Sequence, residues 1–81
     1  MTVSVCFHSY FKDLTGTERV MQELADGSTI AELCGRLTAR FPRLEAMRKS
    51  TLIAVGVDYQ GQDHVLRDGD EVSLFPPVQG G

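Results

Sequence analysis

The residues of this chain that could do chemistry are few, and the most informative ones stand at its C-terminal end. The last six residues are Pro76, Pro77, Val78, Gln79, Gly80 and Gly81. Two prolines fix φ and favour an extended path, and six extended residues reach about 20 Å at roughly 3.3 Å each. The two glycines have no Cβ, so they fit a narrow channel that excludes other residues. This pattern predicts a functional tail over residues 76–81, which presents the carboxylate of Gly81 to another protein.

The rest of the chain shows no catalytic set. His8 and His64 are the only histidines, and neither stands at metal-ligand spacing from a cysteine. Cys6 and Cys34 are too few for a disulfide framework or a four-thiolate cluster, so we expect them to be small buried or half-buried hydrophobes. The glycine-rich patterns that hold phosphates do not occur. The sequence therefore predicts a chain that is no enzyme on its own and binds no cofactor or metal.

Size and charge exclude several classes of protein. The 81 residues carry a net charge of −3 and form one domain's worth of chain. Its basic residues form no run, unlike the charge pattern of a nucleic-acid binder. The sequence has neither an apolar stretch near the ~20 residues that a membrane helix needs nor a secretion signal at its start. These features predict a cytoplasmic protein without a nucleic-acid or membrane partner, and its mild acidity fits a basic protein partner.

Two strands are expected in the N-terminal third. Residues 2–10 alternate in polarity with a β-branched and aromatic bias, which is typical of a half-buried strand. Turn-forming residues follow at 13–16, where Gly16 is available for a positive φ. A second strand over 18–24 would complete a hairpin. The side chains expected to face inward are Val3, Val5, Phe7, Val20 and Leu24.

The clearest local signal is a helix start. Thr29 and Glu32 have the spacing of a capping box, in which a hydroxyl and a carboxylate satisfy free N–H groups. The apolar stripe that follows consists of Ile30, Leu33, Cys34, Leu37 and Phe41. Pro42 ends this helix, and residues 43–50 are expected to be a short helical or irregular connector anchored by Leu44 and Met47.

The second half predicts a returning sheet. Residues 51–57 are mostly apolar, as in a central strand. A polar turn is expected over 58–62, a short strand at best over 65–66, and a turn over 68–70. Residues 71–75 alternate again, which places Val72 and Leu74 inward. The whole predicts an α+β domain over 1–75, with a mixed sheet of four to five strands and one main helix across it.

At this point the residues resemble a known family. Residues 68–72 read Asp-Gly-Asp-Glu-Val, residues 75–78 read Phe-Pro-Pro-Val, and Gly80-Gly81 follow. This combination closely resembles the small subunits of molybdopterin synthase. Weaker matches extend over the chain at Phe7, Asp13-Leu14-Thr15-Gly16, Thr29, Leu33 and Ala54-Val55. The resemblance implies the ubiquitin-like β-grasp fold.

The resemblance also implies a function and partners. In that family an adenylating enzyme related to ubiquitin-activating enzymes uses ATP to activate the terminal glycine, here Gly81. Sulfur from cysteine then arrives through a persulfide, from a desulfurase or rhodanese-like protein, and gives a C-terminal thiocarboxylate. The tail enters the large subunit of the synthase, within a heterotetramer, and passes its sulfur to cyclic pyranopterin monophosphate. The chain itself binds no cofactor.

A partner surface is expected beside the tail. Phe75 points outward if Val72 and Leu74 point inward, and His8 and Tyr59 could share its surface, since the family has apolar residues near both positions. Aromatic residues are enriched among interface anchors. For Tyr59 an ordinary loop tyrosine is an equally good interpretation.

Departures from the family pattern leave alternatives open. Gly56 stands where many relatives have Asn, and Lys12 replaces a common Arg, which loses the forked hydrogen bonding of a guanidinium. The closest alternative is a sulfur carrier for thiamin thiazole, cysteine or a tungsten cofactor, although the double proline argues against the thiazole carrier. A ubiquitin-like modifier, joined through Gly81 to lysines of target proteins, would use the same activated carboxylate.

Overall fold

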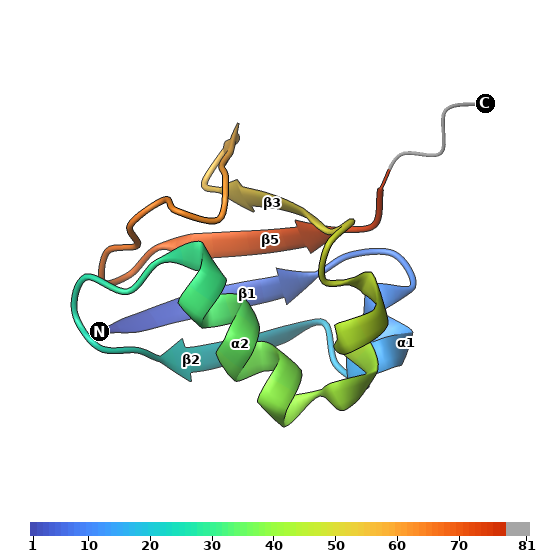
Figure 1. The fold of residues 1–81 in the computed structure, drawn as a ribbon. Helices are drawn as coiled ribbons and strands as arrows, with labels where there is room; N and C mark the ends of the chain where they lie inside the picture. The colour runs from blue at the N-terminus through green and yellow to red at the C-terminus, as the bar shows by residue number, and fades with distance from the viewer. Residues whose placement is uncertain (78–81) are drawn as a thin grey trace.

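The computed structural model describes residues 1–77 of the chain. Five strands and three short helical segments alternate along these residues (Figure 1). Their bounds are β1 Thr2–Phe7, α1 Phe11–Thr15, β2 Arg19–Glu23, α2 Ile30–Arg40, the 3-10 helix η1 Pro42–Met47, β3 Leu52–Val55, β4 Asp58–Tyr59 and β5 Glu71–Phe75. The expected α+β class is confirmed.

The strands form one mixed sheet in the order β2-β1-β5-β3-β4. β1 pairs in parallel with β5, with Phe7 opposite Leu74, and every other pairing is antiparallel. The two strands at the ends of the described chain therefore lie side by side at the centre (Figure 1). β3, expected to be central, lies instead between β5 and the two-residue β4.

One face of the sheet is covered by helix α2, which begins as the capping box predicts. The Glu32 N–H donates to the Thr29 hydroxyl at 3.4 Å, and Ile30, Leu33, Cys34 and Leu37 are buried. They pack in one core cluster with inward residues of the strands, such as Val72. Each fully buried aliphatic side chain of this kind stabilises the fold by about 1.5–3 kcal/mol. Figure 1 shows α2 and η1 on the same side, which leaves the other face of the sheet without a helix.

Two expectations for the first third were wrong. The segment expected to be a turn over 13–16 belongs largely to helix α1, which ends at Gly16 with φ +77°. Five residues are too few to show helical periodicity, and the helix is held by Phe11, whose side chain is fully buried. β1 also ends at Phe7 instead of residue 10, because Ser9 takes a left-handed φ of 57° that a strand does not allow.

The polar turn expected over 58–62 was also misplaced. The turn is formed by Gly56 and Val57, and Asp58 and Tyr59 return as β4 beside β3. Gly56 has φ +62°, a conformation that glycine adopts freely and that asparagine tolerates better than most residues. The departure from the relatives' asparagine therefore keeps the backbone geometry.

The short strand expected at best over residues 65–66 is reduced to an isolated bridge, from Val65 to Thr29.

The outer edge of β2 is capped by side chains. Strand pairing turns the N–H and C=O groups of Arg19, Met21 and Glu23 away from β1. Thr17 Oγ1 donates to the Arg19 carbonyl at 3.1 Å. Arg40 Nη1, from α2, donates to the Met21 carbonyl at 3.0 Å. The Gln22 amide donates to the Glu23 carbonyl at 3.0 Å, so all three outward carbonyls of this edge are occupied.

The longest helix in residues 1–77 is α2, with 11 residues. A membrane crossing takes about 20 apolar residues in a helix, so none of the described helices could span a bilayer.

Candidate functional site

The chain leaves the sheet at the C-terminal end of β5, beside the end of β1. Phe75 is the last residue of β5, and Pro76 and Pro77 follow it, both half-buried. The remaining tail residues identified from the sequence, Val78, Gln79, Gly80 and Gly81, lie outside the described residues. The described part of the site is therefore the surface at the root of the tail.

That surface is an aromatic cluster of His8, Tyr59 and Phe75. The His8 ring stacks on Phe75 with centroids 4.3 Å apart and planes 11° apart. Tyr59 meets Phe75 edge to face, with centroids 6.2 Å apart and planes at 65°. Offset-stacked and edge-to-face pairs of this kind are the favoured aromatic geometries. The structure thus brings together the three residues that the sequence suggested for one surface.

Strand pairing positions each member of the aromatic cluster. Because Phe7 lies opposite Leu74 in the parallel pair, the next residues, His8 and Phe75, also lie side by side. The His8 N–H donates to the Leu74 carbonyl at 3.1 Å and fixes this register beyond the end of β1. Tyr59 reaches the cluster from β4 through its pairing with Ala54 of β3. Three separate segments therefore meet at one point.

The His8 ring nitrogen Nε2 is buried, and no residue among those described satisfies it with a hydrogen bond. Leaving a buried polar atom unpaired costs about 1–3 kcal/mol, so native proteins rarely do it without a reason. This unpaired nitrogen therefore marks the cluster as an unusual position in the described fold.

Sequence reasoning missed one member of this surface. Leu52, the first residue of β3, lies directly opposite Phe75 and is half-buried. Tyr59, in contrast, is 66% exposed. The surface at the root of the tail is therefore more apolar than the three aromatic residues alone suggest. Only the β3–β5 pairing could have identified Leu52, and the sequence does not show which residues pair.

The cysteines are structural. Cys34 is buried in α2, and this burial raises the pKa of its thiol above the ordinary value of 9.0, against the smaller opposing effects of the Arg48 charge and a hydrogen bond to Gln62. Its nucleophilic thiolate is thus disfavoured at neutral pH. Cys6 is half-buried on β1. Within residues 1–77, His, Cys, Asp and Glu side chains form no group of three that could hold a metal ion.

The two other residues of interest occupy ordinary positions. Lys12, on α1, lies 3.7 Å from the Glu18 carboxylate, with both side chains largely exposed, and such a surface pair contributes little. His64 lies in the loop between β4 and β5, and its carbonyl accepts the Ile30 N–H at 3.0 Å. The loop carbonyls thus satisfy N–H groups at the start of α2.

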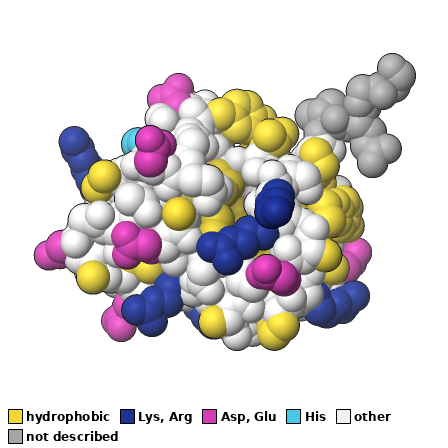
Figure 2. All heavy atoms as spheres, in the orientation of Figure 1, with side chains coloured by type: hydrophobic (Ala, Val, Ile, Leu, Met, Phe, Trp, Pro, Cys, Tyr) yellow, Lys and Arg dark blue, Asp and Glu magenta, His cyan; other side chains and the backbone are white. Residues whose placement is uncertain are grey.

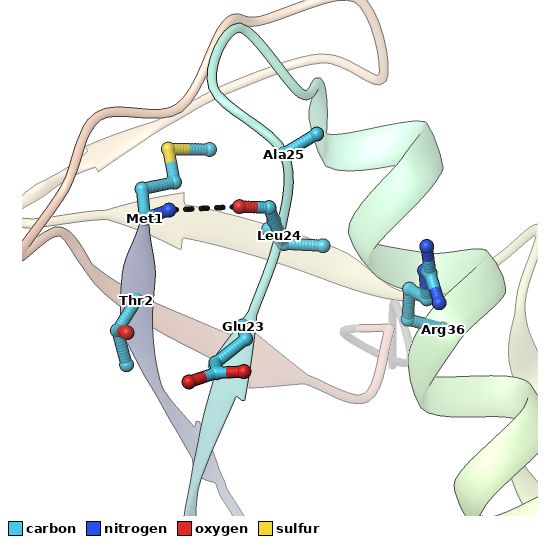
Figure 3. A pocket seen from close by; sticks show the side chains of 6 residues that line it. All are labelled: Met1, Thr2, Glu23, Leu24, Ala25 and Arg36. Carbon is cyan, nitrogen blue, oxygen red and sulfur yellow. Dashed lines mark hydrogen bonds between the residues drawn. The ribbon is translucent and has the colours of Figure 1, made fainter.

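A large hollow lies at the opposite end of the sheet (Figure 3). Its volume is about 500 Å³, and Met1, Thr2, Glu23, Leu24, Ala25 and Arg36 line it. Two of these lining residues are joined by a hydrogen bond, from the amino group of Met1 to the Leu24 carbonyl, at 2.8 Å. Since β1 and β5 run parallel, this end of β1 is the one farthest from Phe75. The hollow is therefore remote from the tail.

A mixed five-stranded sheet crossed by one helix defines the ubiquitin-like β-grasp class of proteins. A ubiquitin from Caldiarchaeum subterraneum shares this fold, with a TM-score of 0.66 and 15% identity over 100% of this chain and 98% of that one. Within this class, the chain belongs to the ThiS family, which it matches over residues 7–81.

The relatives share one description. Over 81 residues the chain is 36% identical to the molybdopterin synthase sulfur carrier subunit of Escherichia coli, covering 98% of this chain and 99% of that protein. Over 83 residues it is 31% identical to the subunit of the same name from Chlamydomonas reinhardtii, covering 100% of both.

Solved structures agree with this grouping. Molybdopterin converting factor subunit 1 from Pyrococcus furiosus matches with a TM-score of 0.88 and 28% identity, over 96% of this chain and 99% of that one. A chain in the complex of subunits 1 and 2 of the molybdopterin-converting factor from Helicobacter pylori matches with a TM-score of 0.70 and 26% identity, over 100% of both chains. The family resemblance drawn from the sequence is confirmed.

Proposed function

We propose that this chain is the sulfur-carrier small subunit of a molybdopterin synthase, with the transferred sulfur carried on Gly81. The observation that carries the proposal is the aromatic cluster of His8, Tyr59 and Phe75 at the root of a Pro-Pro-Val-Gln-Gly-Gly tail. A docking surface in this place fixes the direction in which the tail leaves. The shared description of the relatives supplies the chemistry.

The chemistry begins at the terminal carboxylate. A carboxylate is a poor electrophile, and transfer of AMP from ATP to its oxygen, with release of pyrophosphate, creates a good leaving group. A persulfide then displaces AMP and forms an acyl disulfide. The thiolate of a second cysteine then attacks the donor's sulfur, so a disulfide forms between these two cysteines and the thiocarboxylate leaves on Gly81. An adenylating enzyme and a sulfur-donor protein, a desulfurase or a rhodanese-like protein, supply these steps in the cytoplasm.

Delivery to the large subunit completes the function. Tethering the thiocarboxylate by a short tail raises the local concentration of sulfur where cyclic pyranopterin monophosphate is bound. The carrier itself contributes no catalytic group and needs no resident cofactor. The relative from Helicobacter pylori was solved in complex with its subunit 2, which supports a large subunit as the partner here.

The aromatic cluster fits a partner interface. Exposed aromatic side chains anchor many protein interfaces, and Tyr59 and Phe75 offer two beside the tail. Docking on these rings therefore gains apolar burial beside the tail.

The charge distribution along the chain supports a basic partner. Arg36, Arg40, Arg43, Arg48 and Lys49 all lie on α2, η1 and the segment after it, and Figure 2 shows dark-blue side chains on that helical side. Outside residues 36–49 the chain has ten acidic and three basic residues. The chain outside residues 36–49 is thus net acidic, which favours encounter with a basic surface.

Intact-mass spectrometry tests the proposed function. The chain is incubated with ATP, the cognate adenylating enzyme and a sulfur source, and is then mixed with the large subunit and cyclic pyranopterin monophosphate. The expected result is replacement of one oxygen by sulfur on Gly81, reversed when molybdopterin forms. A mass that never changes would contradict the proposal, and isopeptide conjugates to lysines would assign the chain to the protein modifiers instead.

A further inference from the structure

Val57 is the most exposed large hydrophobic residue among those described, with 95% of its surface accessible. It lies at the tip of the β3–β4 hairpin, where Val55 and Asp58 pair and only Gly56 and Val57 form the loop. Figure 1 shows this hairpin projecting from the body of the sheet. No residue of the described part, 1–77, covers the Val57 side chain.

Turn chemistry does not explain a valine at this position. Gly56 has φ +62°, and Val57 is not among the residues with positive φ; glycine alone at the first loop position is the pattern of a type II′ turn. The second position of such a loop favours Asn, Ser or Asp. A residue that breaks a local preference without any packing gain is expected where function requires it.

The hairpin tip lies beside the start of β5, where the Gly56 N–H donates to the Glu71 carbonyl at 2.9 Å, and β4 connects it to the surface at the root of the tail. Tyr59, two residues beyond Val57, is 66% exposed and lies against Phe75 at 6.2 Å between centroids. β3 has four residues and is therefore about 13 Å long. Figure 2 shows hydrophobic side chains along the upper rim of the molecule, between the hairpin and the tail.

One partner can contact both places. A standard interface covers about 800 Å² of each protein, which is roughly 30 Å across. The distance from Phe75 to the hairpin tip fits within that footprint. A partner that receives the tail and packs on Tyr59 and Phe75 thus extends naturally to Val57.

We infer that Val57 is a hydrophobic anchor that enters an apolar pocket of the large synthase subunit, at the border of the surface that receives the tail. This inference rests on the proposed function and names a contact within it. Asp58 is exposed beside Val57. We therefore expect basic residues at the rim of the partner's pocket, in keeping with the basic partner inferred from charge. Gly56 sets the direction in which the anchor projects.

Calorimetric titration of the large subunit with three variants tests this contact. Val57→Asn removes the apolar group and installs a residue that the turn prefers, so the unfolding midpoint is expected to stay or rise. Its Kd for the large subunit is expected to increase about tenfold, the effect of losing one buried aliphatic side chain. Val57→Ile keeps the apolar group and is expected to retain wild-type affinity.

Val65→Asn is the matched control. Val65 is also an exposed valine, at 54%, but it lies outside the hairpin and bridges to Thr29. Its substitution is expected to change Kd by no more than about twofold, as for an ordinary surface change. An equal loss of affinity in both asparagine variants would overturn a specific role for Val57.

Two further outcomes would overturn the inference. One is a Val57→Asn variant that binds the large subunit as the wild type does. The other is a variant that loses affinity only for the adenylating enzyme, which would assign the anchor to a different partner. A wild-type chain that binds the large subunit but never carries sulfur would contradict the proposed function. The ratio of the Kd of the Val57→Asn variant to that of the wild type would still decide the role of Val57.

Discussion

The two ends of the sheet differ in what they offer to another molecule. At the end where β1 begins lies the hollow of about 500 Å³, and two of its lining residues are joined by a hydrogen bond from the Met1 amino group to the Leu24 carbonyl. At the end where β5 finishes lie a stack of His8 on Phe75 and an edge contact from Tyr59. The first end is concave and polar, and the second is apolar and continues into the tail.

This difference teaches where to look for function in a carrier protein. A pocket is the usual first choice for a site, but a chain that delivers its own end to a partner has no need of one. Its requirements are a covalently loaded end and a surface that orients it. In the proposed function both requirements are met at the end of β5, and neither is assigned to the hollow at the other end.

The strongest way to break this comparison is to change the tail. Gly81→Ala, or one residue added after Gly81, is expected to reduce sulfur transfer at least about 100-fold, because small displacements of a reacting group have effects of that size. The fold of residues 1–77 should not change, as circular dichroism would report. Normal molybdopterin formation by either variant would contradict the tail mechanism.

The aromatic cluster gives the next largest effect. Phe75→Ala is expected to weaken binding to the large subunit by about 2 kcal/mol, or roughly 30-fold in Kd, as for a central interface anchor. Met21→Ala is a suitable control, because Met21 is 59% exposed but lies on β2, away from β5. Equal affinities of the Phe75 variant and the wild type, measured by titration calorimetry, would remove Phe75 from the interface.

A smaller effect is expected in the hairpin that holds Tyr59 against Phe75. Gly56→Ala should lower the free energy of unfolding by about 1–2 kcal/mol, because a Cβ is strained at φ +62°. No atom lies within 4 Å of the Cβ that alanine would add, so the cost is purely conformational. Gly56→Asn should cost less, and urea denaturation of both variants measures the difference. Equal stability of the alanine variant and the wild type would exclude the strain.

The smallest effect is expected at the polar hollow. Arg36 lines that hollow and is exposed, far from the tail. Arg36→Ala should leave both sulfur transfer and affinity for the large subunit within about twofold of the wild type. A large loss in either measurement would mean that the end of the sheet with the hollow also takes part in sulfur transfer or in binding the large subunit.

Local patterns in the sequence predicted the elements whose signals are long enough to read. The capping box at Thr29 and Glu32 located the start of α2, and the alternation in residues 71–75 located β5. α1 and β4 were missed, because five residues show little helical periodicity and two show no alternation. Both elements instead depend on tertiary contacts, those of buried Phe11 in α1 and those of β3 beside β4.

The candidate site was likewise predicted only in part from the sequence. The tail could be predicted because its glycines and prolines are contiguous in the sequence. The proximity of His8, Tyr59 and Phe75 was suggested only by family resemblance, since nothing in the sequence reveals that β1 lies parallel to β5. Leu52 was missed for this reason, because its place opposite Phe75 follows entirely from the β3–β5 register.

The capped edge of β2 bears on how the protein behaves when it is abundant. An uncapped strand edge invites neighbouring copies to join it and grow into ribbons. Arg40 comes from α2 to occupy the Met21 carbonyl, so this protection depends on the helix remaining packed. Any heat or solvent stress that loosens α2 uncovers the edge at Met21, in the middle of β2, at the same moment, and precipitation should then begin before the sheet itself is lost.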